Sequence, residues 1–277
     1  MTTPSTPTAS RAGRNLPVAA AVGVLLAGLV LVTIYTVKEL FVALVVLVLA
    51  VAAHEVTAVL RSSGVQVPLV PLVAGSTVML ISAYSSGLDA LSAAYVLTIT
   101  AVALARLAGP AVDLGRDVLV GVLIVTYLPL LASFAMVMLA APDGPDRIVV
   151  FILAVVMSDI GGYTAGVLLG KHRMAPKVSP KKSWEGFAGS VIFGAVATVV
   201  SVQLLLAGTW WQGLAIGVVA VLTATVGDLT ESLLKRDLGV KDMGRLLPEH
   251  GGIMDRLDSL LPTAPVVALL LVAVVGT

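Results

Sequence analysis

The 277-residue chain contains no cysteine. This absence excludes disulfides, thiolate catalysis and metal sites with cysteine ligands. Charged residues are also scarce, at 12% of the chain, against about 25% in an average soluble domain. The formal net charge is only +1, so no large basic field indicates binding to nucleic acid. The charges are too few to cover a water-soluble protein of this length.

Apolar residues, by contrast, make up 58% of the chain and occur in long uninterrupted blocks. A helix that crosses a lipid bilayer needs about 20 apolar residues in succession. We therefore predict an all-α, polytopic integral membrane protein with about nine transmembrane helices. Their expected ranges are 16–37, 40–60, 67–84, 89–109, 118–140, 148–170, 187–207, 211–227 and 257–276.

The distribution of Lys and Arg predicts the orientation, because cytoplasmic loops of membrane proteins carry an excess of both. Residues 1–15 are rich in Ser, Thr, Pro and Ala and are predicted to form a disordered cytoplasmic tail. With this end inside, only Lys38 and Arg147 of the 17 Lys and Arg residues fall outside. We therefore predict an N-in, C-out topology.

Charge is also distributed unevenly along the chain, so its two halves differ. They are not self-similar, as the halves of many transporters are. The first five predicted spans carry few charges, whereas the last four include both long polar loops. We predict a transmembrane scaffold over residues 16–147. A catalytic half then covers residues 148–277, with cytoplasmic loops at 171–186 and 228–256.

Asp159 stands within the apolar range 148–170, where a carboxylate is costly and usually faces a cavity or a partner. Gly162, Gly166 and Gly170 follow at intervals of four, so a helix places them on one face. Such spacing of small residues is typical of close helix packing in membranes. We predict a functional role for Asp159 and a packing role for the glycines.

A loop with five basic residues follows, between Lys171 and Lys182. One interpretation is the ordinary basic flank of a transmembrane helix, which also binds anionic lipid head groups. Ser183 is the predicted N-cap of the next helix, with Glu185 in its first turn. A helix N-terminus beside lysines is also suited to binding phosphate.

The strongest feature is the segment from Asp228 to Asp258, which holds seven carboxylates, five Lys or Arg residues and one His. Helical spacing puts Asp228, Glu231, Ser232 and Lys235 on one face, and Asp255 and Asp258 on another. Carboxylates from two facing helix ends form an all-oxygen site suited to Mg²⁺. The predicted metal ligands are Asp228, Asp255 and Asp258.

The basic residues of this segment are suited to binding several phosphate oxygens. Together with a metal site, they favour phosphoryl or nucleotidyl transfer, in which positioning and charge neutralisation supply most of the catalysis. The alternative is a solvated juxtamembrane loop whose ion pairs cancel one another. The basic residues concerned are Lys235, Arg236, Lys241, Arg245 and Arg256.

The same segment resembles the signature of phosphatidate cytidylyltransferases (CDP-diacylglycerol synthases), S-x2-K-R-x4-K-D-x-G-x2-L-x2-H-G-G-x2-D-R-x-D. So many fixed positions at fixed spacing make the match highly specific. It is carried by Ser232, Lys235, Arg236, Lys241, Asp242, Gly244, Leu247, His250, Gly251, Gly252, Asp255, Arg256 and Asp258.

The upstream stretch is similar to a second motif of that family, in which Asp-x3-Tyr, Gly-x3-Gly-Lys and Ser-Pro-x-Lys-x2-Glu-Gly follow one another. Ile160 and Ser183 depart from the family's usual residues, a hydroxyl residue and a Thr. The matching residues are Asp159, Tyr163, Gly166, Gly170, Lys171, Ser179, Pro180, Lys182, Glu185 and Gly186.

The resemblance implies that CTP and phosphatidic acid give CDP-diacylglycerol and pyrophosphate with Mg²⁺, as a step of phospholipid biosynthesis. It implies a cell (inner or plasma) membrane location, with the active site at the cytoplasmic face among membrane lipids. A second, monovalent cation and a homodimer are left open. The implied catalytic residues are Asp228, Lys235, Arg236, Lys241, His250, Asp255 and Arg256. The implied substrate contacts are Asp159, Tyr163, Lys171, Ser179, Lys182, Glu185, Ser232 and Arg245.

Three rival interpretations deserve comparison. A CDP-alcohol phosphotransferase needs a D-G-x2-A-R…G-x3-D series, which the sequence lacks. A CTP-dependent polyprenol kinase could share the membrane architecture, but the close signature match disfavours it. A transporter would use Asp159 and Glu55 as intramembrane ion sites. Glu55, preceded by His54, is otherwise interpreted as an interfacial charge or as part of a lipid cleft.

Overall fold

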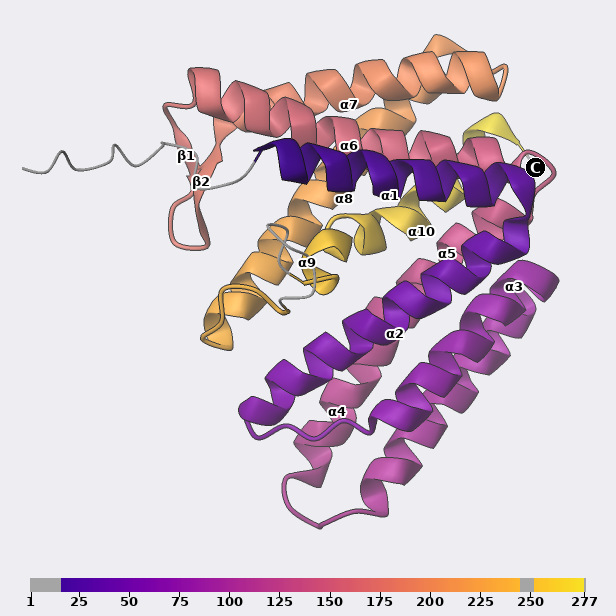
Figure 1. Ribbon diagram of the computed structural model, residues 1–277, viewed down its shortest axis with the longest axis vertical. Coiled ribbons are helices and arrows are strands. Elements are labelled where there is room, and N and C mark those ends of the chain that lie inside the picture. The colour runs from indigo at the N-terminus through magenta and orange to yellow at the C-terminus, as the bar shows by residue number, and fades with distance from the viewer. Residues whose placement is uncertain (1–15, 245–251, 277) are drawn as a thin grey trace, which may run out of the picture.

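The computed structural model describes residues 16–244 and 252–276 (Figure 1). Within these ranges the chain is helical except for short connections and one two-stranded hairpin. The elements are α1 (Leu16–Thr36), α2 (Lys38–Ser62), α3 (Leu69–Leu107), α4 (Leu114–Val125), η1 (Thr126–Leu130), α5 (Leu131–Ala140), α6 (Gly144–Leu169), β1 (Arg173–Ala175), β2 (Ser179–Ser183), α7 (Trp184–Leu205), α8 (Trp210–Asp237), α9 (Met254–Leu257), α10 (Leu260–Leu270) and η2 (Leu271–Val275).

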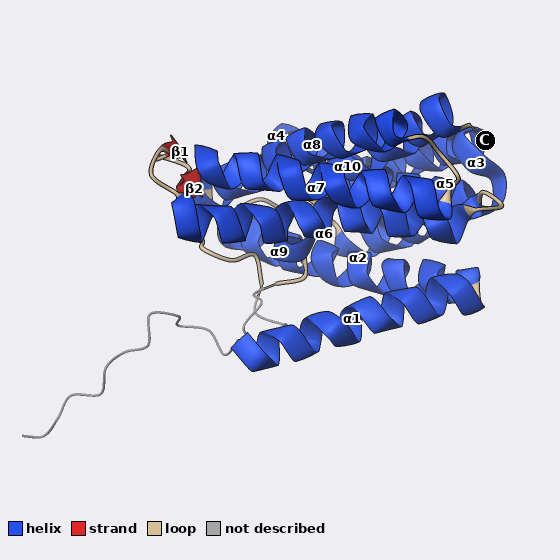
Figure 2. Cartoon of the chain, turned by 90° about the horizontal axis from the view of Figure 1, so that it is seen from above, coloured by secondary structure: helices blue, strands red, loops and turns tan. Residues whose placement is uncertain are grey.

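The β1–β2 hairpin lies at one end of the helices and the C-terminus at the other (Figure 2), and Figure 1 shows α2 and α3 inclined to α1, α6 and α7. In the described part of the chain, seven helical segments are long and apolar enough to cross a membrane, with α3 counted once. The predicted all-α polytopic membrane protein is therefore confirmed. Helix α1, which contacts α2 and α6, adds a further apolar stretch, Gly23–Thr36.

Helix α3 folds back on itself at Gly87. This residue has φ +73°, a left-handed conformation that glycine adopts without steric cost. A Cβ on Gly75 would lie 2.3 Å from Cγ2 of Thr98, whereas a straight helix would separate these residues by about 34 Å. The two legs of α3 are therefore antiparallel, and they correspond to the predicted spans 67–84 and 89–109. Each leg is about 30 Å long, the thickness of a bilayer core.

The next predicted span, 118–140, is formed by α4, η1 and α5 in one continuous stretch. Pro129 lies inside the π-helical turn η1. Because proline lacks an N–H, it removes one helical hydrogen bond, and a local π turn accommodates that loss. The core lies among the helices of both halves, since α10 contacts α5 on one side and α8 on the other.

Two local differences from the sequence prediction matter for the site. Helix α8 runs to Asp237, ten residues beyond the predicted span end at 227, because polar residues continue the helix where hydropathy falls. The predicted loop 171–186 contains strands β1 and β2, paired antiparallel with Ala175 opposite Ser179. The hairpin is short and polar, so neither hydropathy nor alternation indicated it.

The two cations predicted to lie outside the membrane both bind backbone carbonyls. Lys38 donates from Nζ to the carbonyls of Leu139 (3.1 Å) and Ala141 (2.8 Å), at the end of α5. Arg147 donates from Nη2 to the carbonyl of Gly276 (2.7 Å) and also binds Asp143. These contacts give additional donors to carbonyls at helix ends, where hydrogen bonds within the helix run out.

Candidate active site

Glycines bring α6 and α7 into close contact. A Cβ on Gly189 would lie 2.5 Å from the carbonyl oxygen of Gly161, and one on Gly162 would lie 2.4 Å from Oγ of Ser190. The predicted packing role of Gly162 is thereby confirmed, and the seam extends to glycines of α7 that the sequence analysis did not single out. The close approach places the N-terminus of α7 beside the face of α6 that carries Asp159.

The hairpin joins these helices and is held at its base. Ser183 is the N-cap of α7, as predicted, and its Oγ accepts from the backbone N–H of Gly186 (3.1 Å). Glu185 accepts from the backbone N–H groups of Lys171 (3.1 Å) and His172 (3.2 Å). Nδ1 of His172 lies 2.6 Å from the same carboxylate. Glu185, a predicted substrate contact, thus binds the segment that leads into the hairpin.

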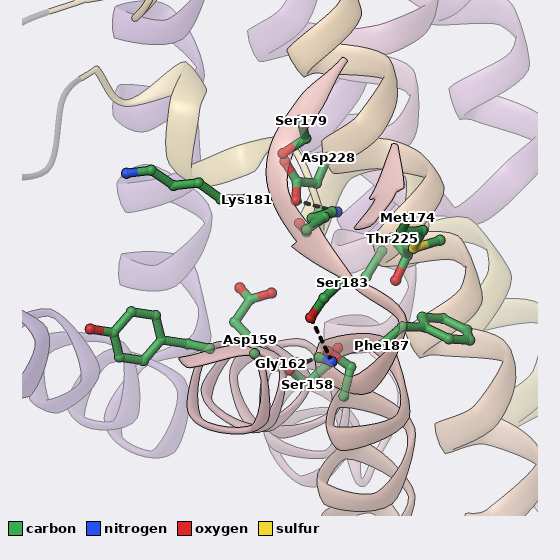
Figure 3. A pocket seen from close by; sticks show the side chains of 17 residues that line it. Ser158, Asp159, Gly162, Met174, Ser179, Lys181, Ser183, Phe187, Thr225 and Asp228 are labelled. Carbon is green, nitrogen blue, oxygen red and sulfur yellow. Dashed lines mark hydrogen bonds and ion pairs between the residues drawn. The ribbon is translucent and has the colours of Figure 1, made fainter. Parts of the chain in front are cut away.

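A pocket of about 260 Å³ lies between α6, the hairpin, the start of α7 and α8 (Figure 3). In Figure 3 the Asp159 carboxylate points from α6 into this space. Tyr163 also lines the pocket, and its side chain is largely exposed. Five of the residues predicted from the sequence line the pocket. They are Asp159, Tyr163, Ser179, Lys182 and Asp228.

Charges of both signs meet at the pocket wall. Lys182, on strand β2, forms an ion pair with Asp228 of α8. Asp228 also accepts from Oγ of Ser232, one helical turn later (3.3 Å). Asp159 and Asp228 both line the pocket, and Asp258 directly precedes Ser259, which lines it as well, so like charges gather here. Repelling carboxylates of this kind are stabilised when a cation joins them.

A second charged cluster lies at the C-terminal part of α8, where Asp255 is 6% exposed and Glu231 is 2% exposed. Asp255 accepts from Nζ of Lys235 (2.8 Å) and from the backbone N–H groups of Met243 (3.1 Å) and Gly252 (2.8 Å). Lys235 also forms an ion pair with Glu231. This cluster therefore ties the end of α8 to the segment before α9.

Most of the other predicted residues lie around this region. Arg236 donates from Nε to the carbonyl of Val178, which joins α8 to the turn of the hairpin. Lys171, Lys241 and Arg256 are exposed. The predictions for Arg245 and His250 fall outside the described residues.

Over residues 16–244 and 252–276, no three acidic or histidine side chains converge in a geometry that would hold a metal ion. Both carboxylate oxygens of Asp255 already accept hydrogen bonds, from Lys235 and from the backbone N–H groups of Met243 and Gly252. Asp159 and Asp228, in contrast, both face the pocket. One or two carboxylates together with substrate phosphates are a common Mg²⁺ site, so the pocket-facing pair fits this ion.

Two residues near the charged segment were missed or misread from the sequence. Gly227 was not predicted as functional, although a Cβ there would lie 2.5 Å from the carbonyl oxygen of Asp258. Its lack of a side chain lets α8 approach the start of α10. Glu55, interpreted as an interfacial charge or a cleft residue, is instead buried at 7% exposure. Its partners lie about 200 positions away in the chain, so no local pattern indicated them.

Comparison with known proteins supports one family. The model of the "Cytidylyltransferase family" matches residues 18–274. The chain is 44% identical over 280 residues to a phosphatidate cytidylyltransferase of Mycobacterium leprae (strain TN), covering 95% of this chain and 89% of that protein. A Mycobacterium bovis protein of the same name is 42% identical over 275 residues, covering 94% and 89% of the two chains. One from Staphylococcus haemolyticus is 39% identical over 131 residues, covering 47% and 50%. Because the family model spans nearly the whole length, the chain belongs to the cytidylyltransferase family.

Proposed function

We propose that the chain is a nucleotidyltransferase that transfers the cytidylyl group of CTP to phosphatidic acid, giving CDP-diacylglycerol and pyrophosphate. The mycobacterial relatives carry the name of this activity and match the chain over almost its full length. The observation that carries the proposal is the pocket at the hairpin end, where Lys182 lies between the carboxylate-bearing helices α6 and α8.

The reaction joins two anions. An oxygen of the phosphatidate phosphate attacks the α-phosphorus of CTP, forming a new P–O bond. The bond from that phosphorus to the oxygen bridging the β-phosphate breaks, and pyrophosphate leaves with the electron pair. The attacking phosphate is already an anion at neutral pH, so no side chain needs to remove a proton. The main task of the protein is therefore to offset repulsion and to align the reactants.

The basic and polar residues of the site divide this task by position. Lys182 and Ser179, on the hairpin, contact phosphate oxygens in the pocket, with Lys171 at the hairpin base. Lys235 holds Asp255, which in turn holds the backbone before α9. Tyr163 lies on the pocket edge and is 70% exposed, so it faces the side from which a bilayer lipid enters.

Mg²⁺ is the proposed cofactor, and when bound it draws charge from the phosphate oxygens and so favours attack and departure. Asp228 is its first proposed ligand, with Asp159 across the pocket and Asp258 nearby. Asp255 can join this set only if its hydrogen bond with Lys235 breaks and frees one carboxylate oxygen. A monovalent cation next to Mg²⁺ is a separate proposal, which an activity titration with K⁺ and Na⁺ tests.

The proposed topology has nine crossings, if α1 and the two legs of α3 are each counted. The N-terminus and the hairpin end then face the cytoplasm, where CTP is available, and the protein resides in the cell membrane. The excess of Lys and Arg at the hairpin end supports this orientation. A homodimer remains a further proposal, which the mass of the purified protein in detergent tests.

The direct test uses protein purified in detergent and incubated with labelled CTP and phosphatidic acid, with and without Mg²⁺. The expected products are a lipid that carries labelled CMP, and free pyrophosphate. Formation of CDP and a newly phosphorylated lipid would instead identify a kinase. Solute flux in proteoliposomes without cleavage of CTP would identify a transporter.

A further inference from the structure

Glu55 is the one carboxylate of the N-terminal half that reaches the C-terminal charged segment among the described residues. It lies on α2, and its Oε2 accepts from the backbone N–H of Met254 at 3.0 Å. The side chain is 7% exposed. Burial of a carboxylate is costly unless its oxygens are used, and Oε1 has no hydrogen-bond partner among the described residues.

The backbone packs tightly around this carboxylate. A Cβ on Gly244 would lie 2.0 Å from Oε1 of Glu55, and one on Gly252 would lie 2.6 Å from Oε2. Gly244 is not among the glycines with a positive φ, so this position needs glycine for close approach rather than for an unusual backbone conformation. A Cβ on Gly252 would also lie 2.6 Å from the backbone nitrogen of Gly244, so these two residues are neighbours.

Asp255 binds the same stretch of backbone and shares Gly252 with Glu55. It binds the N–H groups of Met243 and Gly252, and it binds Lys235 of α8. We call Met243, Gly244, Gly252 and Met254 the neck. The neck is thus held between two buried carboxylates, one from α2 and one from α9.

We infer that Glu55 is a positioning residue for nucleotidyl transfer, which sets the neck and thereby the Asp255–Lys235 pair. The catalytic consequence of this inference rests on the proposed function. The contact between Glu55 and the neck does not depend on that function. It assigns to the N-terminal half a part in the active site beyond that of a scaffold. Glu55 is not among the residues that line the pocket; it acts through Asp255 and Lys235.

The first test compares Glu55→Ala, Glu55→Gln and the matched control His54→Gln, which changes the exposed neighbour. Because a small displacement of aligned groups is costly, we expect Glu55→Ala to lower kcat by about 10- to 100-fold. Glu55→Gln keeps one oxygen that can accept from Met254, so it should recover part of that loss, with the KM for CTP changed less than kcat. His54→Gln should stay within about twofold of the unsubstituted chain.

The second test measures the neck itself. The chain lacks cysteine, so Met243→Cys, at a position 3% exposed, provides a single label site. We expect a water-soluble maleimide to react several-fold faster with Met243→Cys when Glu55→Ala or Glu55→Gln is also present, and no faster with His54→Gln. If Glu55→Ala does not fold, Glu55→Gln carries both tests.

A double-mutant cycle tests the contact with Gly244 directly. Gly244→Ala should lower kcat/KM by about tenfold or more when Glu55 is present, and much less in Glu55→Ala, where the space is vacant. Additive effects, or unchanged kcat and labelling in folded Glu55 variants, would overturn the inference. No turnover by the unsubstituted chain would instead reject the proposed function, and the labelling comparison would still decide the role of Glu55.

Discussion

Lys182 and Asp228 form an ion pair across the pocket, although one lies on a β-strand and the other on a helix 46 positions later in the chain. The pair is partly exposed, with side-chain exposures of 25% and 34%, so it contributes little to stability in itself. Its position in the pocket wall is what matters, because a substrate phosphate can take the place of the carboxylate beside Lys182.

We expect Lys182→Gln to weaken the binding of CTP. A hydrogen bond to a charged group contributes about 1.5–3 kcal/mol, which corresponds to a rise of about 10- to 100-fold in KM. Lys177→Gln, at an exposed position in the turn of the same hairpin, is the matched control and should change KM by less than about twofold. Equal KM values for the two variants would remove Lys182 from the CTP site.

Asp228→Asn and Asp255→Asn should both stop turnover, but for different reasons. Asp228 faces the pocket, so its variant should lose about 100- to 1000-fold in kcat while its thermal stability stays the same. Asp255 is buried against Lys235, so its variant should also lose about 3 kcal/mol of stability. Thermal unfolding in detergent, followed alongside activity, separates the two. Normal turnover by Asp228→Asn would reject its assignment as a metal ligand.

Turnover should depend on a divalent metal ion. We expect EDTA to abolish product formation and added Mg²⁺ to restore it. Asp228→Glu keeps a carboxylate but moves it, so any residual activity should need a higher Mg²⁺ concentration for half-maximal rate. A metal dependence identical to that of the unsubstituted chain would place the ion elsewhere.

The glycine seam between α6 and α7 should tolerate almost no added volume. Gly189→Ala places a Cβ 2.4 Å from that of Ala165, and overpacking of this kind costs about 1–3 kcal/mol. We expect lower thermal stability together with lower activity, because the seam supports the pocket. Gly28→Ala, on α1 with nothing within 4 Å of the new Cβ, should be neutral or slightly stabilising.

The orientation can be measured by labelling single cysteines, since the chain has none of its own. Lys177→Cys, in the hairpin turn, and Ser86→Cys, beside the fold-back of α3, are both exposed. A membrane-impermeant maleimide added to intact cells should label Ser86→Cys and leave Lys177→Cys unlabelled. The opposite result would invert the proposed topology.

Local patterns in the sequence predicted the features that depend on neighbours along the chain. Hydropathy predicted the membrane-spanning helices, and helical spacing predicted that Asp228 and Lys235 share a helical stretch, as α8 confirms. The N-cap at Ser183 follows from residue type and position alone. Each of these depends only on residues that lie within one continuous segment of the chain.

Contacts between distant segments could not be predicted in this way. The partners of Asp255 and Glu55 depend on how α2, α8 and α9 pack, and hydropathy gives no register for that packing. Asp255 was therefore grouped with Asp228 by charge, whereas in the structure Asp255 binds Lys235 and the neck. The glycines of the neck were recognised in the sequence. The carboxylate that leaves no room for a side chain there, that of Glu55, lies on another helix.

The turn at Gly87 affects how many times the chain crosses the membrane. Between the two legs of α3 there is no charged loop long enough to mark a change of direction, and the helical stretch is 39 residues long. If α3 continued straight through Gly87, the chain would cross the membrane one time fewer before Asp228. Every later segment would then emerge on the opposite face, so a single left-handed residue helps to decide which aqueous compartment the pocket can sample.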